Sequence, residues 1–150
     1  MELSQLTKRI YYLEHDPELD RPMLAYLEDD RFSLAVDAGY SASHARDFYR
    51  AIEAEQLKIP DFTIATHWHY GHHAASLHSE DTVCINVLEE KALFLGDSAS
   101  EDYFNGGSLG KEKLRSSVGV IQPTDCAYCI LSHCEPLAKE ELLCYLDGLF

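Results

Sequence analysis

The chain of 150 residues is long enough for one domain with its own hydrophobic core, and we expect a single domain over residues 1–150. Hydrophobic residues make up 46% of it and charged residues 25%, a globular composition that excludes disordered and collagen-like chains. The net charge of −14 argues against nucleic acid and against an anionic membrane surface as partners.

The first third of the chain is typical of β structure. Apolar runs at residues 10–13, 23–27 and 32–36 are separated by the turn-prone segments HDPELDRP and EDDR, and predict a short meander. The next stretch, SASHARDFYRAIEAEQLKI, predicts a helix with a serine N-cap and with Ala45, Phe48 and Ile52 on one side. The run 62–66, which leads to a group of histidines, predicts a buried strand.

The second half continues the alternation of strands and helices. The segments DTVCINVL and KALFLG predict a hairpin with a tight turn at Glu89 and Glu90. A helix is expected over residues 111–121 and a strand over 127–131. A last helix is expected after Pro136, with one apolar stripe made of Ala138, Leu142, Tyr145, Leu146 and Leu149. This order of elements predicts a layered α/β (α+β) domain.

The cysteines and the N-terminal residues bear on the compartment. Five cysteines at irregular spacings predict reduced thiols. Cys126 and Cys129 form a C-x-x-C pattern, but alternation along a strand would send their sulfurs to opposite faces, which argues against a cysteine-based metal or redox site. The start of the chain has no apolar core typical of a secretory signal, and no window resembles a membrane span. We therefore expect a cytoplasmic protein.

Four of the eight histidines lie in one short segment, THWHYGHH, directly after a predicted strand. They are His67, His69, His72 and His73. Neutral imidazole is the commonest protein ligand for zinc and related metals, and His-x-His at a strand end can present both rings to one ion while Trp68 points away. Exposed or core histidines would not explain this place in the chain, so the cluster predicts a metal site.

Three further donors lie beside later apolar runs. His78 precedes DTVCINV, Asp97 directly follows KALFLG, and His133 directly follows AYCILS. Each alone has an ordinary explanation, as a loop residue, a turn residue or a capped core histidine. Open layered α/β folds, however, collect functional groups at strand C-termini. Together with the cluster, these residues supply the nitrogen and oxygen donors of a zinc, iron or manganese site.

Five separated motifs follow one another along the chain: Asp37-Ala38-Gly39, T-H-x-H-x-x-H, a loop histidine, L-F-L-G-D and S-H-C-E-P. Their order, from Ile10 to the last helix, resembles that of the metallo-β-lactamase-fold metallohydrolases. The resemblance implies an αββα sandwich with the metals at the edge of its two sheets. It also implies hydrolysis, in which the metals lower the pKa of a water, orient the substrate and stabilise the developing oxyanion.

The same resemblance implies a role for each donor. His67, His69 and His78 would bind the first metal, His72 and His133 the second, and Asp97 would bridge both as the catalytic carboxylate. Asp37 would support the site by fixing the tautomer of a ligand histidine, or would simply cap the loop that leads into the following helix.

Two departures from the family pattern concern the site. The family motif is H-x-H-x-D-H, whereas this chain has Gly71 in place of the aspartate, which weakens the second metal site unless His73 substitutes. The family has a much longer segment before the next histidine ligand, whereas His72 and His78 are six positions apart. The sandwich is therefore expected to be truncated between His72 and His78, either as a real short form or as a sequence that has lost its middle. A real short form would cover its exposed sheet edges by forming a homodimer.

The leading interpretation is a zinc-dependent hydrolase with one or two ions, iron or manganese being alternatives, that acts on a small-molecule ester, thioester, lactam or phosphodiester. The alternative is a degenerate, non-catalytic metal-binding or scaffold protein of the same fold. A di-iron redox protein is disfavoured because Asp97 is the only carboxylate at a ligand position. His15 and His44 lie outside any motif and are expected to be solvated.

Overall fold

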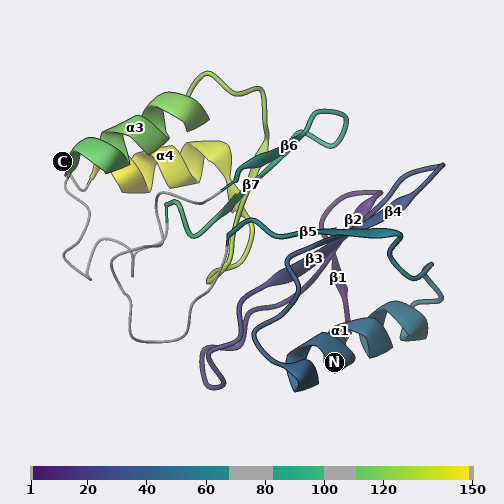
Figure 1. Ribbon diagram of the computed structural model, residues 1–150. Helices are drawn as coiled ribbons and strands as arrows, with labels where there is room; N and C mark the ends of the chain where they lie inside the picture. The colour runs from purple at the N-terminus through teal and green to yellow at the C-terminus, as the bar shows by residue number, and fades with distance from the viewer. Residues whose placement is uncertain (1, 68–82, 100–110, 149–150) are drawn as a thin grey trace. The chain divides into compact units, whose positions relative to one another are not determined.

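The computed structural model describes residues 2–67, 83–99 and 111–148. These residues form two compact units, each built on one sheet (Figure 1). The N-terminal unit comprises Met1–Ala65 and Ser132–Glu135, and the C-terminal unit comprises Thr66–Leu131 and Pro136–Phe150. Each sheet contains both parallel and antiparallel pairs, and helices accompany both, so the predicted α/β class is confirmed.

The N-terminal sheet has the strand order β1-β2-β3-β4-β5. Its strands are β1 (Ser4–Gln5), β2 (Ile10–Leu13), β3 (Leu24–Glu28), β4 (Ser33–Val36) and β5 (Phe62–Ile64). The pairs from β1 to β4 are antiparallel, whereas β5 runs parallel to β4. The three strands predicted as a meander are therefore confirmed to within one residue at each end.

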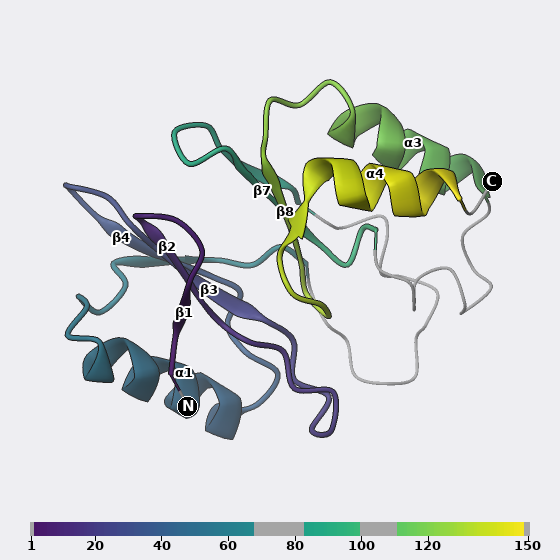
Figure 2. The ribbon, with the colours of Figure 1, turned by 180° about the vertical axis from the view of Figure 1, so that it is seen from behind.

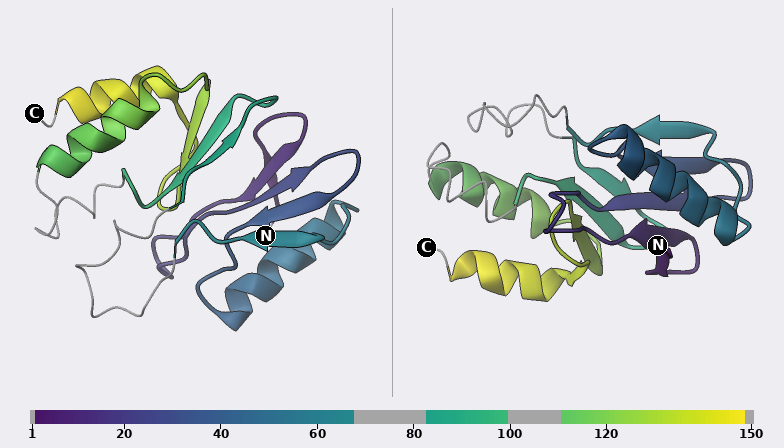
Figure 3. Two further views of the ribbon diagram at one scale, coloured as in Figure 1. Left: turned by 45° about the horizontal axis from the view of Figure 1, so that its top comes forward. Right: turned by 90° about the horizontal axis from the view of Figure 1, so that it is seen from below.

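Helix α1 (Ala42–Ala54) covers one face of this sheet (Figure 3). The side chain of Ser41 accepts a hydrogen bond from the His44 N–H, which confirms the predicted serine cap. Phe48 and Ile52 pack against a group of sheet residues that face the helix: Leu13, Leu24, Tyr26 and Ala35. The helix is amphipathic, and burial of this stripe holds it on the sheet.

The strand predicted over residues 62–66 exists, but the prediction that it is buried is wrong. The side chain of Phe62 is 62% exposed and that of Ile64 is 38% exposed. β5 comes last in the sheet order and pairs only with β4 among the strands that the structure describes. An edge strand has a neighbour on one side only, so an apolar run need not be buried there.

The C-terminal sheet has the strand order β6-β7-β8-β9. Its strands are β6 (Ile85–Val87), β7 (Ala92–Gly96), β8 (Tyr128–Leu131) and β9 (Leu137–Ala138). β6 and β7 form an antiparallel hairpin with its turn at residues 88–91, as predicted, and β7 runs parallel to β8.

Helices α3 (Lys111–Ile121) and α4 (Lys139–Asp147) belong to the C-terminal unit and lie side by side (Figures 1 and 2). Both helices were predicted from the sequence. Leu142 and Leu146 are buried, but Tyr145 is 41% exposed and Ala138 lies in β9, so the predicted stripe of α4 is narrower than expected. Its last member, Leu149, lies outside the described residues.

The predicted truncation falls between His72 and His78, which both lie outside the part of the chain that the structure describes. Thr66 precedes that stretch and Val83 follows it. The Val83 N–H donates a hydrogen bond of 2.6 Å to the carbonyl of Thr66. Among the described helices, none combines the length and the apolar character that a bilayer span needs.

Candidate metal centre

His67 follows strand β5 and is the first histidine of the predicted metal motif. Its side chain is 7% exposed, and the Thr66 hydroxyl lies 2.9 Å from its Nδ1. Thr66 itself is 1% exposed, and its carbonyl accepts the hydrogen bond from Val83. A histidine that binds a metal through Nε2 carries its proton on Nδ1, and Thr66 is placed to accept that proton in a hydrogen bond. The local structure therefore directs Nδ1 toward Thr66 and Nε2 toward Asp97.

Asp97 follows strand β7 at an irregularity in the sheet. The register between β7 and β8 shifts between Phe94 and Gly96, which is the signature of a β-bulge. Gly96 has φ of 56°, in the left-handed region that suits glycine. The Leu95 carbonyl accepts hydrogen bonds from both the N–H and the hydroxyl of Ser98, at 3.1 and 2.5 Å. The bulge and this turn fix the direction in which the chain leaves the sheet at Asp97.

The two side chains meet inside the C-terminal unit. Nε2 of His67 lies 3.2 Å from Oδ2 of Asp97, and the Asp97 side chain is 8% exposed. Two ligand atoms each about 2.1 Å from a tetrahedral zinc ion are about 3.4 Å apart, so this separation suits two ligands of one ion. The pair also combines nitrogen and oxygen donors, which suits zinc, iron and manganese. The distance between Nε2 and Oδ2 and the types of donor thus fit the zinc, iron or manganese site that the sequence predicts.

Every other predicted site residue lies either outside the described residues or in the N-terminal unit. His69, Gly71, His72, His73 and His78 lie outside the described residues. His133 and Asp37 belong to the N-terminal unit, whereas His67 and Asp97 belong to the C-terminal unit. Within the described ranges, no three histidine, cysteine or acidic side chains converge as a metal-binding group.

The segment that carries His133 follows strand β8 and is held to the N-terminal sheet. The Ser132 carbonyl accepts a hydrogen bond of 2.6 Å from the Met23 N–H. The Tyr12 hydroxyl donates to Oε2 of Glu135 at 3.1 Å. His133, which lies between these two anchors, is half-buried. The segment is therefore fixed on both sides of the predicted ligand.

Asp37 lies in a turn between β4 and α1, with φ of 67°. Its N–H donates a hydrogen bond of 2.8 Å to the carbonyl of Ile64, the last residue of β5. A left-handed conformation is uncommon for a residue with a side chain, although aspartate tolerates it better than most. The N-cap of α1 itself is Ser41, so the two roles predicted for Asp37, in the loop and at a ligand histidine, both stay predictions.

His44 contradicts its sequence prediction, because it is 1% exposed and not solvated. Burial, followed by the charge of Arg21, lowers the pKa of His44 below its ordinary value of 6.5. Helical spacing could have predicted this burial. His44 lies four residues before Phe48, on the buried side of α1 together with Ala51. Ala45, which was predicted on that side, is only half-buried.

All five cysteines are described and are free thiols, as predicted. The expectation that Cys126 and Cys129 point to opposite faces is wrong, because the Cys126 thiol lies close enough to that of Cys129 to raise its pKa. The physical reason is that β8 begins at Tyr128, so strand alternation does not extend back to Cys126. Burial, and next the neighbouring Cys126, raise the pKa of Cys129 to about 12.

Solved structures with the same fold are metallo-β-lactamases. The DIM-1 metallo-β-lactamase matches with a TM-score of 0.60 and 10% identity over 100% of this chain and 99% of that one. An NDM_FIM-1-like metallo-β-lactamase from Erythrobacter litoralis, in a mono-zinc form, matches with a TM-score of 0.63 and 13% identity over 98% and 96%. A metallo-β-lactamase from Hirschia baltica matches with a TM-score of 0.55 and 13% identity over 97% and 96%. At these identities the likeness is one of fold. Neither a protein-family model nor a curated protein sequence matches the chain.

Proposed function

We propose that this chain, which has the metallo-β-lactamase fold, is a metal-dependent hydrolase with zinc as its leading metal and iron or manganese as alternatives. The observation that carries the proposal is the buried pair of His67 and Asp97, with Nε2 and Oδ2 3.2 Å apart. Both residues follow strands, where layered α/β folds collect functional groups.

In this proposal, His67 and Asp97 hold the metal together with the other predicted ligands, namely His69, His72, His78 and His133. When bound, the metal supplies Lewis-acid chemistry and lowers the pKa of a water. Thr66 Oγ1 accepts the Nδ1 proton of His67 and so keeps the ring in one tautomer. Burial of both side chains excludes bulk water and strengthens their electrostatic interaction with a cation.

We propose a small molecule as the substrate, with an ester, thioester, lactam or phosphodiester bond. The net charge of −14 disfavours a polyanion such as nucleic acid and disfavours an anionic membrane surface. We also propose that a second copy of the chain is a partner, and the exposed edge strand β5 supports this. Sedimentation equilibrium would test it, and a monomer at all concentrations would contradict it.

Metal analysis of the protein purified at neutral pH without chelator tests the proposed function. We expect at least one equivalent of a transition metal in the wild type and less in Asp97→Asn. Asp125→Asn is the matched control, because Asp125 is 83% exposed and only pairs with Lys91 at the surface. Hydrolysis of generic substrates of the four classes should follow the metal content. Less than about half an equivalent of any transition metal in the wild type would overturn the proposal.

Gly71 favours a second candidate, a degenerate protein in which a metal stabilises the fold without catalysis. The family pattern has an aspartate at this position, and its loss removes a ligand of the second metal. Gly71→Asp tests this alternative with the same substrates, with and without added zinc. Hydrolysis that appears only in Gly71→Asp favours the degenerate protein, whereas hydrolysis by the wild type favours the enzyme.

A further inference from the structure

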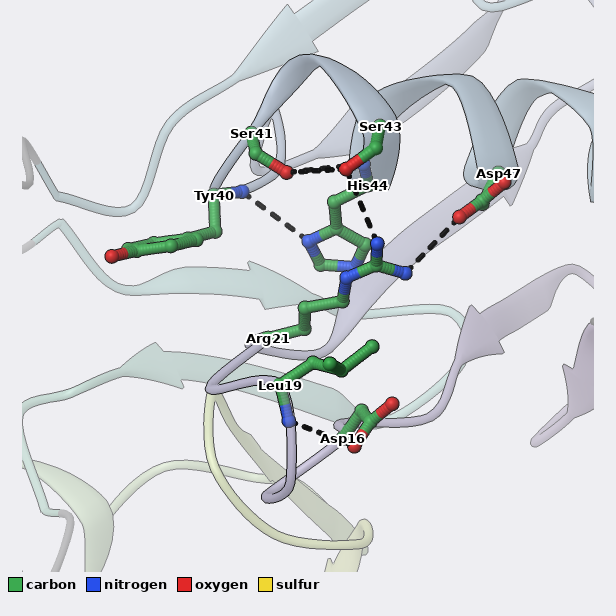
Figure 4. Close-up of polar contacts among 8 residues, drawn as sticks. All are labelled: Asp16, Leu19, Arg21, Tyr40, Ser41, Ser43, His44 and Asp47. Atoms are coloured by element: carbon green, nitrogen blue, oxygen red, sulfur yellow. Dashed lines mark hydrogen bonds and ion pairs between the residues drawn. The ribbon is translucent and has the colours of Figure 1, made fainter.

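A cluster of polar residues in the N-terminal unit surrounds the buried His44 near the start of α1 (Figure 4). The Tyr40 N–H donates a hydrogen bond of 3.3 Å to Nδ1 of His44. Arg21, from the loop between β2 and β3, lies beside the ring and donates to Ser43 Oγ at 3.2 Å and to Asp47 Oδ2 at 3.1 Å. Because Nδ1 accepts this hydrogen bond, the neutral ring carries its proton on Nε2.

The turn that ends at Tyr40 contains two residues in the left-handed region. Asp37 has φ of 67° and Gly39 has φ of 90°. A Cβ atom at Gly39 would lie 3.2 Å from the backbone nitrogen of Ala45, so the turn also packs closely on α1. At Asp37, which carries a side chain, such a conformation persists where the surroundings hold it. The hydrogen bond from the Asp37 N–H to the carbonyl of Ile64 and the ring of His44 both contribute to holding this turn.

We infer that His44 is a positioning residue for Asp37: its neutral ring holds the Asp37–Tyr40 turn through the Tyr40 amide, and protonation of the ring releases that turn. The inference rests on the proposed function, together with the supporting role at a ligand histidine that the family resemblance implies for Asp37. It adds a titratable control of metal affinity that is remote from the ligands.

Burial and the charge of Arg21 favour the neutral form of His44. Burial is the largest cause of the lowered pKa of His44 and Arg21 the next, while Asp47 and Asp16 act in the opposite direction. Protonation turns Nδ1 from an acceptor into a donor that faces the Tyr40 N–H, so this hydrogen bond is lost. It also places a second cation beside Arg21. The turn is thus held above the ordinary histidine pKa of about 6.5 and released as the pH falls toward the lowered value.

Two variants separate the positioning role from a general loss of stability. His44→Asn offers an amide oxygen close to the position of Nδ1 and does not titrate. His44→Leu keeps a similar volume and removes the acceptor. His15→Asn is the matched control, because His15 lies in the same unit outside the cluster. The first measurement is the amide chemical shift of Tyr40 by nuclear magnetic resonance, as a function of pH, in metal-free protein. The second is the affinity for zinc between pH 7.5 and 5.5.

In the wild type and in His15→Asn, we expect the Tyr40 shift to titrate below pH 6.5, and zinc affinity to fall by about tenfold more over this range than in His44→Asn. His44→Leu should bind zinc about tenfold more weakly at pH 7.5, and His44→Asn should restore the affinity. A Tyr40 shift that does not titrate, or that titrates equally in His44→Asn, would overturn the positioning role. Equal zinc affinity of His44→Leu and the wild type would overturn the coupling to the site. A wild type that binds no metal would overturn the proposed function and this coupling, while the metal-free titration would still decide the positioning role.

Discussion

His67 and Asp97 were identified from the sequence as donors at strand ends, and the structure brings them together. Residue type and place in the chain suffice for this prediction, because strand C-termini gather at one edge of a layered fold. The sequence could not show the hydroxyl of Thr66 beside Nδ1, since threonine before the motif is equally at home as an ordinary β residue. The supporting contacts of a site depend on side-chain direction, which periodicity alone does not determine.

At Asp37, the backbone and the carboxylate can be separated by two substitutions. Asp37→Asn keeps a residue that tolerates φ of 67°, so we expect unchanged stability and a loss of about 10- to 100-fold in metal affinity. Asp37→Ala should in addition destabilise the fold by about 1 kcal/mol. Isothermal titration with zinc and thermal unfolding measure the two effects. Equal zinc affinity of Asp37→Asn and the wild type would contradict a supporting role of the carboxylate.

Cys129 should be chemically inert in the folded protein. Its thiol is buried and its pKa is raised to about 12, so very little reactive thiolate is present at pH 8. We expect iodoacetamide to modify the exposed Cys84 and Cys144 in the native protein, and Cys129 only after unfolding. Peptide mass spectrometry reads out the modified positions. Native modification of Cys129 at the rate of Cys84 would contradict this.

Helices and strands with a clear periodic pattern of apolar residues were predictable. Strands whose existence or exposure depends on the strands beside them were not. The start of α1 follows from its serine cap and its buried side from helical spacing. The β6–β7 hairpin follows from two apolar runs around a tight turn. β1 and β9 contain two residues each, too few to show any alternation. The exposure of β5 also escaped prediction, because an apolar run does not reveal whether it pairs on one side or on two.

The bulge at the end of β7 is an element-scale device that directs Asp97. Gly96→Ala introduces a side chain at φ of 56°, which we expect to cost about 1–2 kcal/mol and to weaken metal binding. Gly119→Ala is the matched control, since a Cβ atom there meets nothing within 4 Å and alanine favours a helix by about 0.5–1 kcal/mol. Thermal unfolding and zinc titration of both variants measure this. If Gly96→Ala were more stable than Gly119→Ala, the left-handed conformation at the bulge would not matter for stability.

For the whole molecule, motif order was more informative than composition. Five motifs in sequence indicated the fold, and the structural likeness to metallo-β-lactamases extends over nearly the whole chain at 10–13% identity. Composition alone indicated a globular chain with an excess of acidic residues. These charges did not reveal the site, because a metal centre is defined by a few donors that converge, whereas net charge sums the entire surface.

Metal binding should stabilise the folded molecule as a whole. A metal that binds only the native state at a free concentration of 100 times its Kd adds about 2.7 kcal/mol to the free energy of unfolding. We therefore expect added zinc to raise the Tm of the wild type and of Asp125→Asn, and a chelator to reverse this. Asp97→Asn should respond much less, because it lacks a ligand. Differential scanning calorimetry measures these shifts. A wild-type Tm that changes with neither zinc nor chelator would contradict the prediction.

The hydrogen bond between Thr66 and Val83 has a consequence for how such a chain can change in length. It holds the two ends of the intervening segment beside each other. Doubling the length of a closed flexible loop costs only about 0.6 kcal/mol. A long insertion between His78 and Val83 leaves His67, His69, His72 and His78 in the chain, so it should cost little stability, and a graft at this place is a practical way to add a loop to the scaffold.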